Sequence, residues 1–237
     1  MNRLKELLLN YCEQYSLELT DEQAELCLQH LSLVIEKNKT VNLTRILNPQ
    51  DAVALHILDS LILAPYLEDA PSGAMLDMGT GAGFPGIPLA IVSNRRALMI
   101  DSVGKKVDAV NDFIDELGLS QAHAVHERLE LAADQYRHEF AVVTARALAS
   151  LPTLVEYAAP FLMKNGLFIV TKGSPSDDEL SSGIKAARVC GLDLVTESQL
   201  DLPDSLGHRS IYVFKKTKKA SIKLPRANGM ARKNPLA

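Results

Sequence analysis

A glycine-dense turn between two apolar segments constrains this chain more than any other feature. A short apolar run ends at Leu76-Asp77-Met78, the turn Gly79-Thr80-Gly81-Ala82-Gly83 follows, and an apolar helical pattern runs from Ile87 to Ile91. A strand, a glycine loop and a helix in this order are typical of nucleotide-binding α/β domains. Glycine lets the backbone turn tightly and approach a ligand, and the following helix N-terminus offers free N–H groups. The sequence therefore predicts a ligand site at this turn.

Short apolar stretches alternate with helical segments after this turn, which predicts a parallel, doubly wound α/β sheet. The last two stretches are separated by a loop with Pro, Asp and Gly, so we expect a terminal hairpin that adds an antiparallel strand. Seven strands that end in this way favour the Rossmann-like class I methyltransferase sheet over a six-stranded dinucleotide-binding sheet. The predicted strands are Ala74–Met78, Ala97–Ile100, Ala122–Val125, Phe140–Thr144, Leu167–Thr171, Leu192–Glu197 and Ser210–Phe214.

The two ends of the chain differ from this central part. The N-terminal part is expected to be helical, because Thr20–Gln23 matches a capping box and Asn48-Pro49, a capping residue before proline, is typical of a helix start. Pro71-Ser72-Gly73 interrupts the helical pattern. We therefore predict an N-terminal helical segment (residues 1–70), a methyltransferase domain (71–216) and an irregular, basic C-terminal tail (217–237).

Charge is distributed unevenly along the chain. The net charge is −4, yet nine of the 25 basic residues follow Asp204 and no acid does. The rest of the chain keeps 16 basic against 29 acidic residues, a net charge of −13. A basic end on an acidic body indicates a polyanionic partner, although a solvated tail without a partner explains the pattern equally well.

The sequence also predicts where the protein works and what it lacks. No apolar run reaches the roughly 20 residues that span a bilayer, and Met1–Glu6 lacks a secretory signal pattern. We therefore expect a cytoplasmic protein without membrane contact. The cysteines, Cys12, Cys27 and Cys190, lack metal-ligand spacing, and His123 and His126 would point to opposite faces of a strand. No metal site is expected.

The glycine loop matches two cofactor patterns. Gly81-x-Gly83-x-x-Gly86, with Asp101 about 20 residues further on, fits the dinucleotide fingerprint and leaves an NAD-dependent oxidoreductase open. Gly79-x-Gly81-x-Gly83 after Asp77 fits S-adenosylmethionine (SAM) equally well. The carboxylate of Asp77 favours SAM, because it would repel a pyrophosphate and suits the cationic methionine end. Gly86 follows Pro85, so we expect it inside the helix rather than in the loop. Asp101 would accept hydrogen bonds from ribose hydroxyls in either case.

Several further motifs follow one another in a recognisable order. The most specific block is Leu76–Ile91, with its Gly-Phe-Pro-Gly-Ile-Pro core. The other segments are Asn42–Thr44, His56–Leu61, Asp101–Lys106, Arg128–Glu130, Thr144–Ala147, Lys172-Gly173, Leu224–Arg226 and Arg232–Leu236. Over nearly its whole length the chain resembles the bacterial 16S ribosomal RNA (guanine-N7)-methyltransferase G family, also called glucose-inhibited division protein B. Thr144 and Leu224 stand where Ser and Tyr are common, and neither touches the predicted chemistry.

This resemblance implies a SAM-dependent enzyme that methylates N7 of one guanine in a loop of 16S ribosomal RNA, free or in the small subunit. It implies cofactor contacts from Gly79, Phe84, Leu129, Glu130 and Arg146. The residues agree in part, because Leu129-Glu130 follows the third strand and Arg146 ends the fourth, at the edge where ligands bind. Gly81 and Asp101 join this set from the loop pattern. The candidate RNA contacts are Lys105, Arg128, Lys172 and Arg226.

The segment Thr144–Ala147 after the fourth strand indicates the chemistry. It lacks the Asn/Asp-Pro-Pro-aromatic motif of exocyclic amine methyltransferases and the nucleophilic cysteine of cytosine C5 enzymes. Guanine N7 needs neither, because its lone pair is free at neutral pH. We therefore predict catalysis by alignment without a general base, with Arg146 as the one candidate for a role in alignment. His56, with Asp59 on the same helical face, is predicted to fix the joint between the helical segment and the sheet. A ribosome-binding module with a vestigial SAM pocket stays open as an alternative.

Overall fold

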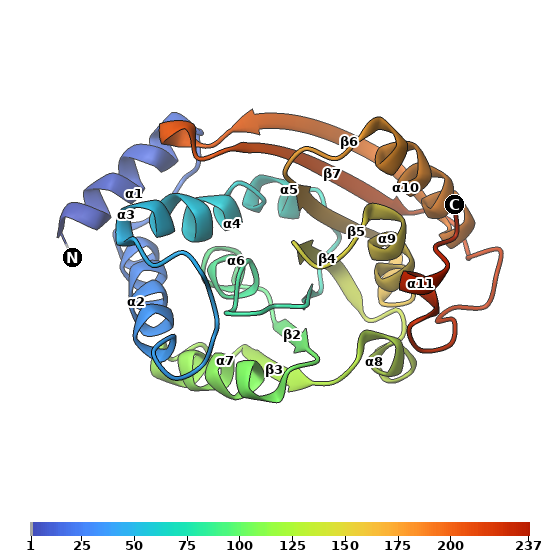
Figure 1. Cartoon of the computed structure of the whole chain (residues 1–237), viewed down its shortest axis with the longest axis horizontal. Coiled ribbons are helices and arrows are strands. Elements are labelled where there is room, and N and C mark those ends of the chain that lie inside the picture. Colours follow the sequence, from blue (N-terminus) through green and yellow to red (C-terminus); the bar gives the residue numbers. More distant parts are fainter. Residues whose placement is uncertain (1) are drawn as a thin grey trace.

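A seven-stranded sheet forms the centre of the molecule. The computed structural model describes residues 2–237, and Figure 1 shows helices on both faces of the sheet. The strands are β1 (Ala74–Met78), β2 (Ala97–Asp101), β3 (Ala122–His126), β4 (Phe140–Arg146), β5 (Leu162–Lys172), β6 (Leu192–Asp201) and β7 (His208–Lys216). Their order is β3-β2-β1-β4-β5-β7-β6; β1 to β5 run parallel and β7 lies antiparallel between β5 and β6. The predicted sheet and its C-terminal antiparallel hairpin are confirmed.

The helices divide between two hydrophobic cores, one on each face. They are α1 (Asn2–Gln14), α2 (Asp21–Lys37), α3 (Pro49–Ala52), the π-helical η1 (Val53–Leu58), α4 (Asp59–Leu61), α5 (Ala64–Glu68), α6 (Gly86–Ser93), α7 (Gly104–Glu116), α8 (Leu129–Gln135), α9 (Leu151–Ala158), α10 (Asp177–Cys190), the 3-10 turn η2 (Pro203–Ser205) and α11 (Met230–Lys233). Helices α1 to α7 share a core with Met75 and Met99, whereas α8 to α11 share a core with Leu76 and Met78. Because successive strand residues face opposite sides, central strands covered on both faces are mostly apolar on both faces.

The N-terminal helices begin at the predicted signals. The Thr20 side chain accepts the Gln23 N–H while the Gln23 side chain accepts the Thr20 N–H, and Asn48 caps α3. The helix that starts at Pro49 runs on to Leu61, with its backbone widening into the π-helix η1 before it continues as α4. Such π-helical turns often occur at functional sites. Here η1 and α4 carry His56 and Asp59 to the edge of the sheet.

The C-terminal segment (217–237) packs against the second core, and apart from the four residues of α11 it has no regular secondary structure, as predicted. Leu224 and Ala231 are buried, and Arg226 forms two hydrogen bonds to the buried Glu156. These two apolar residues lie among basic ones, so the charge pattern gave no indication that the segment packs against the core. The division at residues 70 and 216 stays a prediction, and both end segments share a core with the central part.

No helix of residues 2–237 is long and apolar enough to cross a membrane. The same residues contain no group of three His, Cys, Asp or Glu side chains that could hold a metal ion. Burial raises the pKa of the thiols of Cys12, Cys27 and Cys190, which are free and buried.

Candidate functional site

The glycine loop connects β1 to α6 at the carboxyl edge of the parallel strands. Gly79 and Gly81 have φ angles of +70° and +61°, which L side chains rarely adopt. Asp101, at the end of β2, holds the loop, because its Oδ2 accepts the Gly81 N–H at 3.0 Å and its Oδ1 accepts the Val103 N–H at 2.9 Å. A Cβ added to Gly81 would meet no atom closer than 4.0 Å. The backbone therefore borders open space that a ligand can fill.

A cavity of about 150 Å³, which we call the loop cavity, lies beside these residues. It is lined by Gly79, Ile100, Asp101, Ser102, Glu127, Arg128, Leu129, Glu130, Leu148, Tyr157 and Arg232. Four predicted cofactor residues, Gly79, Asp101, Leu129 and Glu130, thus come together here. Leu148, Tyr157 and Arg232 were not predicted. Of these three, only Arg232 lies in one of the family-like segments of the sequence, Arg232–Leu236, so it alone could have been predicted as a site residue.

Glu130 holds the C-terminal segment against the loop cavity. Its Oε1 accepts the backbone N–H of Gly229 at 2.8 Å and the hydroxyl of Tyr157 at 3.4 Å. Arg232 then donates to the carbonyl oxygen of Leu148 at 3.3 Å. Burial raises the pKa of Tyr157, and the charge of Glu130 raises it further. One wall of the cavity therefore depends on residues at the far end of the chain.

Asp77 does not reach this cavity. Its carboxylate is fully buried, with Oδ2 accepting the Gly86 N–H at 3.1 Å and Oδ1 accepting the Thr144 hydroxyl at 3.0 Å. Burial raises the pKa of Asp77 to about 6, and the hydrogen bonds from the Thr144 hydroxyl and the Gly86 N–H oppose that shift. The prediction that Asp77 faces the cationic end of the cofactor was wrong, because the carboxylate binds the first turn of α6. Gly86 begins that helix, as predicted.

Phe84 lies in a stack of rings that joins the loop to the N-terminal helices. Its ring centroid is 4.4 Å from that of His30 and 4.7 Å from that of His56, with the His56 ring nearly parallel to it. The guanidinium of Arg146 lies 5.6 Å from the ring centroid. Phe84 is 4% exposed and does not line the loop cavity. Its contact with the cofactor stays a prediction.

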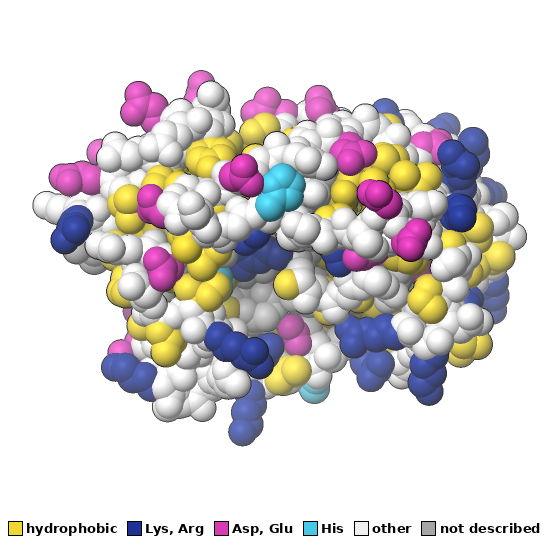
Figure 2. All heavy atoms as spheres, turned by 45° about the horizontal axis from the view of Figure 1, so that its top comes forward, with side chains coloured by type: hydrophobic (Ala, Val, Ile, Leu, Met, Phe, Trp, Pro, Cys, Tyr) yellow, Lys and Arg dark blue, Asp and Glu magenta, His cyan; other side chains and the backbone are white. Residues whose placement is uncertain are grey.

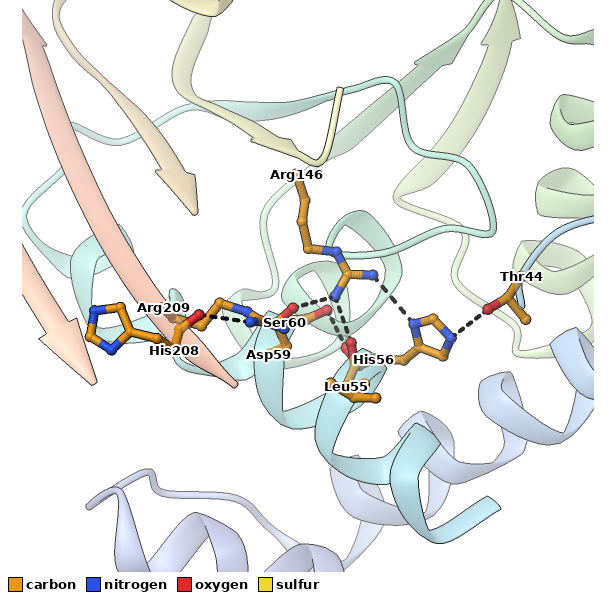
Figure 3. A network of polar contacts seen from close by, with 8 residues as sticks. All are labelled: Thr44, Leu55, His56, Asp59, Ser60, Arg146, His208 and Arg209. Atoms are coloured by element: carbon orange, nitrogen blue, oxygen red, sulfur yellow. Dashed lines mark hydrogen bonds and ion pairs between the residues drawn. The ribbon is translucent and has the colours of Figure 1, made fainter. Parts of the chain in front are cut away.

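Arg146 lies at the end of β4 and points toward η1 and α4 (Figure 3). Its Nη1 donates to the Leu55 carbonyl oxygen and to Asp59 Oδ2, both at 3.1 Å. Arg209, at the start of β7, donates from Nε to Asp59 Oδ1 at 2.6 Å. The buried carboxylate of Asp59 therefore lies between two guanidinium groups. Asp59 thus supplies the anion that offsets the cost of burying the Arg146 guanidinium.

His56 occupies the joint between the helical segment and the sheet, as predicted. Its Nε2 lies 2.9 Å from the Thr44 hydroxyl and its Nδ1 lies 3.5 Å from Arg146 Nη2 (Figure 3). Burial lowers the pKa of His56 to about 3, and the charge of Arg146 lowers it further. The ring is therefore neutral at pH 7, and it adds no charge to the two arginines and one aspartate beside it.

A second cavity, of about 340 Å³, lies over the ends of β4 and β5, and we call it the arginine cavity. It is lined by Ile46, Leu55, His56, Asp59, Arg146, Ala147, Thr171, Lys172, Gly173 and Arg209. Ala147 has a φ of +50°, an uncommon conformation for a residue with a Cβ. The next residue, Leu148, lines the loop cavity instead. The turn Arg146–Leu148 therefore lies between the two cavities.

The four predicted RNA contacts lie in different surroundings. Lys105 and Arg128 are exposed, and Arg128 lines the loop cavity. Lys172 pairs with Glu179 at 2.8 Å and Arg226 pairs with Glu156 at 2.6 Å, so the protein already compensates these two charges. The ion pair with Lys172 lowers the pKa of Glu179 although burial opposes that shift. RNA binding stays a prediction for all four, and the geometry favours it least for Arg226.

Other basic residues of the C-terminal end gather at the opposite edge of the sheet. A groove of about 750 Å³ there is lined by six basic residues and no Asp or Glu: Arg137, Lys164, Lys216, Lys218, Lys219 and Lys223. Figure 2 shows a separate feature, a hollow on one face with Lys and Arg side chains in and around it and most Asp and Glu side chains above it. Both arrangements suit a polyanion.

Comparisons with known proteins identify the family. The model of the family described as rRNA small subunit methyltransferase G matches residues 23–206. The chain belongs to this family. A ribosomal RNA small subunit methyltransferase G of Lactobacillus acidophilus is 38% identical over 228 residues, which cover 94% of this chain and 95% of that protein. Its counterpart in Desulforamulus reducens is 36% identical over 240 residues, which cover 100% of both chains.

Solved structures share the fold. Cofactor-bound Rv0187 from MTB superposes with a TM-score of 0.57 at 17% identity, over 80% of this chain and 90% of that one. A point mutant of MtNAS in complex with S-adenosylmethionine gives a TM-score of 0.54 at 15% identity, over 89% of this chain and 78% of that one. These two show the fold alone. Together with the family membership they confirm the predictions of a class I fold and of a SAM-dependent rRNA methyltransferase.

Proposed function

We propose that this methyltransferase transfers the methyl group of SAM to N7 of a guanine in a loop of 16S ribosomal RNA, free or in the small subunit, in the cytoplasm. The family description, which names the small-subunit rRNA, supports the choice of RNA. The observation that carries the choice of atom is the end of β4. The Thr144 hydroxyl there is bound to Asp77, and Arg146 is a cation bound to Asp59, so neither serves as a proton acceptor.

The residues around the loop cavity fit the cofactor. The open space beside Gly81 admits a ligand against the backbone, and the Asp101 carboxylate suits ribose hydroxyls. Leu129 and Ile100 offer apolar surface for an adenine. When bound, SAM supplies a methyl group on a positively charged sulfur, and that charge passes to the purine. Guanine N7 carries a free lone pair, so the residues of the chain only have to align the two reactants, which can lower a barrier by about 7–11 kcal/mol.

Chemical cleavage at N7-methylguanine tests this function. Borohydride and aniline treatment should cut 16S rRNA from wild-type cells at one guanine. The cut should be absent from the rRNA of a strain that lacks this gene, and it should return when the gene is restored. An unchanged cleavage pattern would refute the proposal. Label transfer from radioactive SAM to naked 16S rRNA and to small subunits, assayed side by side, identifies the form that is methylated. SAM binding without transfer to either form would instead support a ribosome-binding module.

Asp101→Ala is expected to weaken the binding of S-adenosylhomocysteine (SAH) by about 1–3 kcal/mol, because charge-assisted hydrogen bonds to the ribose are lost. The variant also frees the N–H groups of Gly81 and Val103, which Asp101 now holds. Isothermal titration calorimetry measures the effect. Asp108→Ala, which removes an exposed carboxylate from α7, is the matched control and should leave the affinity unchanged. An unchanged dissociation constant for Asp101→Ala would place the ribose elsewhere.

A further inference from the structure

The arginine cavity has a size and a lining that suit a single nucleobase. Its volume of about 340 Å³ lies in the range of sites that enclose small ligands, about 300–1,000 Å³. Ile46, Leu55 and Ala147 give it apolar walls, and Arg146 and Arg209 give it polar ones. It borders the turn Arg146–Leu148, whose other side faces the loop cavity. A base held here would therefore lie next to the cofactor.

Hydrogen-bond donors outnumber acceptors among the charged groups of this cavity. Asp59 is the one carboxylate in the lining, and both of its oxygens are bound by Arg146 and Arg209. Among residues 2–237, no acceptor is found for Arg146 Nε or Arg209 Nη2. Thr171 adds a buried hydroxyl that has no partner within the same residues. Hydrogen-bond donors that lack an acceptor in a cavity favour the binding of a ligand that supplies acceptors.

The edge of guanine that carries N7 presents two acceptors, N7 and O6, whereas adenine presents N7 and an amino donor. Because N7 is the atom to be methylated, its lone pair has to stay free, which excludes the usual arginine contact to both atoms. A donor to O6 alone is compatible with the reaction, and the same donor would repel the adenine amino group. N7 is nucleophilic in both purines, so a donor to O6 gives the enzyme a means of selecting guanine.

We propose that the arginine cavity receives the target guanine and that Arg209 determines the choice of base by donating a hydrogen bond to O6. This inference rests on the proposed function, because it assumes that guanine N7 is the acceptor. Asp59 orients Arg209 for this contact through its bond to Nε, which leaves Nη2 available to the base. Arg146 pairs with the other oxygen of Asp59 and so keeps the carboxylate satisfied when Arg209 is replaced.

A functional-group substitution in the RNA tests the contact. The substrate is 16S rRNA, in the form that the wild-type enzyme methylates, with guanine or 2-aminopurine ligated at the target position; 2-aminopurine keeps N7 and lacks O6. We expect 2-aminopurine to lower kcat/KM at least 10-fold with the wild-type enzyme. Arg209→Gln should lower kcat/KM for guanine by a similar factor, with little further loss on 2-aminopurine. Arg209→Lys should be as stable as the wild type, because the lysine can still pair with Asp59. It should show only part of the wild-type preference for guanine over 2-aminopurine.

A filling substitution tests the cavity itself. Gly173 lines the arginine cavity, and a Cβ added there would meet nothing within 4 Å, so Gly173→Trp should fold. We expect it to lower kcat/KM for RNA at least 10-fold and to leave the affinity for SAH unchanged. Ser174→Trp, at the next exposed position outside the lining, is the matched control.

The outcomes separate this inference from the proposed function. Wild-type enzyme that methylates neither naked RNA nor small subunits at guanine would refute the function. With wild-type activity present, equal losses on 2-aminopurine in the wild type and in Arg209→Gln would overturn the inference. Weaker SAH binding in Arg209→Gln or Gly173→Trp would assign the cavity to the cofactor instead. A reduced salt dependence of RNA binding without any base effect would assign it to a phosphate.

Discussion

Gly81→Val is expected to weaken SAH binding at least about 100-fold, a loss of about 2.7 kcal/mol or more. The added side chain would occupy the space beside the loop, where Gly81 now meets no atom closer than 4.0 Å. Valine is stiff at χ1, so it cannot fold away from a ligand as a longer chain could. The N–H of Gly81 is also bound to Asp101, so any shift of the loop disturbs the predicted ribose contact. Calorimetry with SAH measures the loss.

The control for this substitution is Gly118→Val. Gly118 has a φ of +67°, close to the +61° of Gly81, and a Cβ added there also meets nothing within 4 Å. A β-branched residue in this conformation costs roughly 1–2 kcal/mol at either position. Gly118 lies after α7, whereas the Gly81 N–H is bound by Asp101, which lines the loop cavity. Both variants should therefore melt at a lower temperature, and only Gly81→Val should lose SAH. Equal affinities in the two variants would show that the ligand does not lie against this loop.

The sheet was predictable because its signals are local. Most strands contain a short run of buried apolar residues and are followed by turn residues, so six of the seven predicted starts fall within two residues of the observed ones. The exception is β5, which begins at Leu162 instead of Leu167. Leu162 joins the sheet by pairing with Phe140 of β4, and the exposed, polar Lys164 and Asn165 lie in the irregularity that separates this pair from the next one, Val142 with Leu167. Pairing partners cannot be read from one strand alone.

The loop cavity was predictable where its residues follow a strand directly. Gly79 follows β1, Asp101 is the last residue of β2 and Leu129-Glu130 come shortly after β3, and the carboxyl ends of these strands meet at one edge. Asp77 was misplaced because a strand residue faces one side only, and Asp77 shares the side of Met75, which packs in the core with α6. The arginine cavity joins Asp59 to Arg209, 150 residues apart in sequence. A contact between residues so far apart in sequence cannot be predicted from a local sequence pattern.

Arg226→Ala is expected to lower the free energy of unfolding by about 3–5 kcal/mol, because it leaves a buried carboxylate without its cation. Glu156 is 3% exposed, and Arg226 donates to both of its oxygens, at 2.7 and 2.6 Å. Arg226 also donates to the carbonyl oxygen of Asn234, so the substitution should release the C-terminal segment. Glu130 would then lose its contact with Gly229, at the wall of the loop cavity. Urea unfolding measures the stability.

Two further variants decide whether Arg226 serves the fold or the RNA. Lys223→Ala removes an exposed charge three residues away and should change stability by no more than about 0.5 kcal/mol. The double variant Arg226→Met/Glu156→Leu should recover most of the lost stability, because this apolar pair is of similar volume and leaves no unpaired charge. If Arg226 bound phosphate as the sequence predicted, the double variant would still lose RNA affinity and a unit of salt dependence. The buried ion pair leads us to expect RNA binding close to that of the wild type in the double variant.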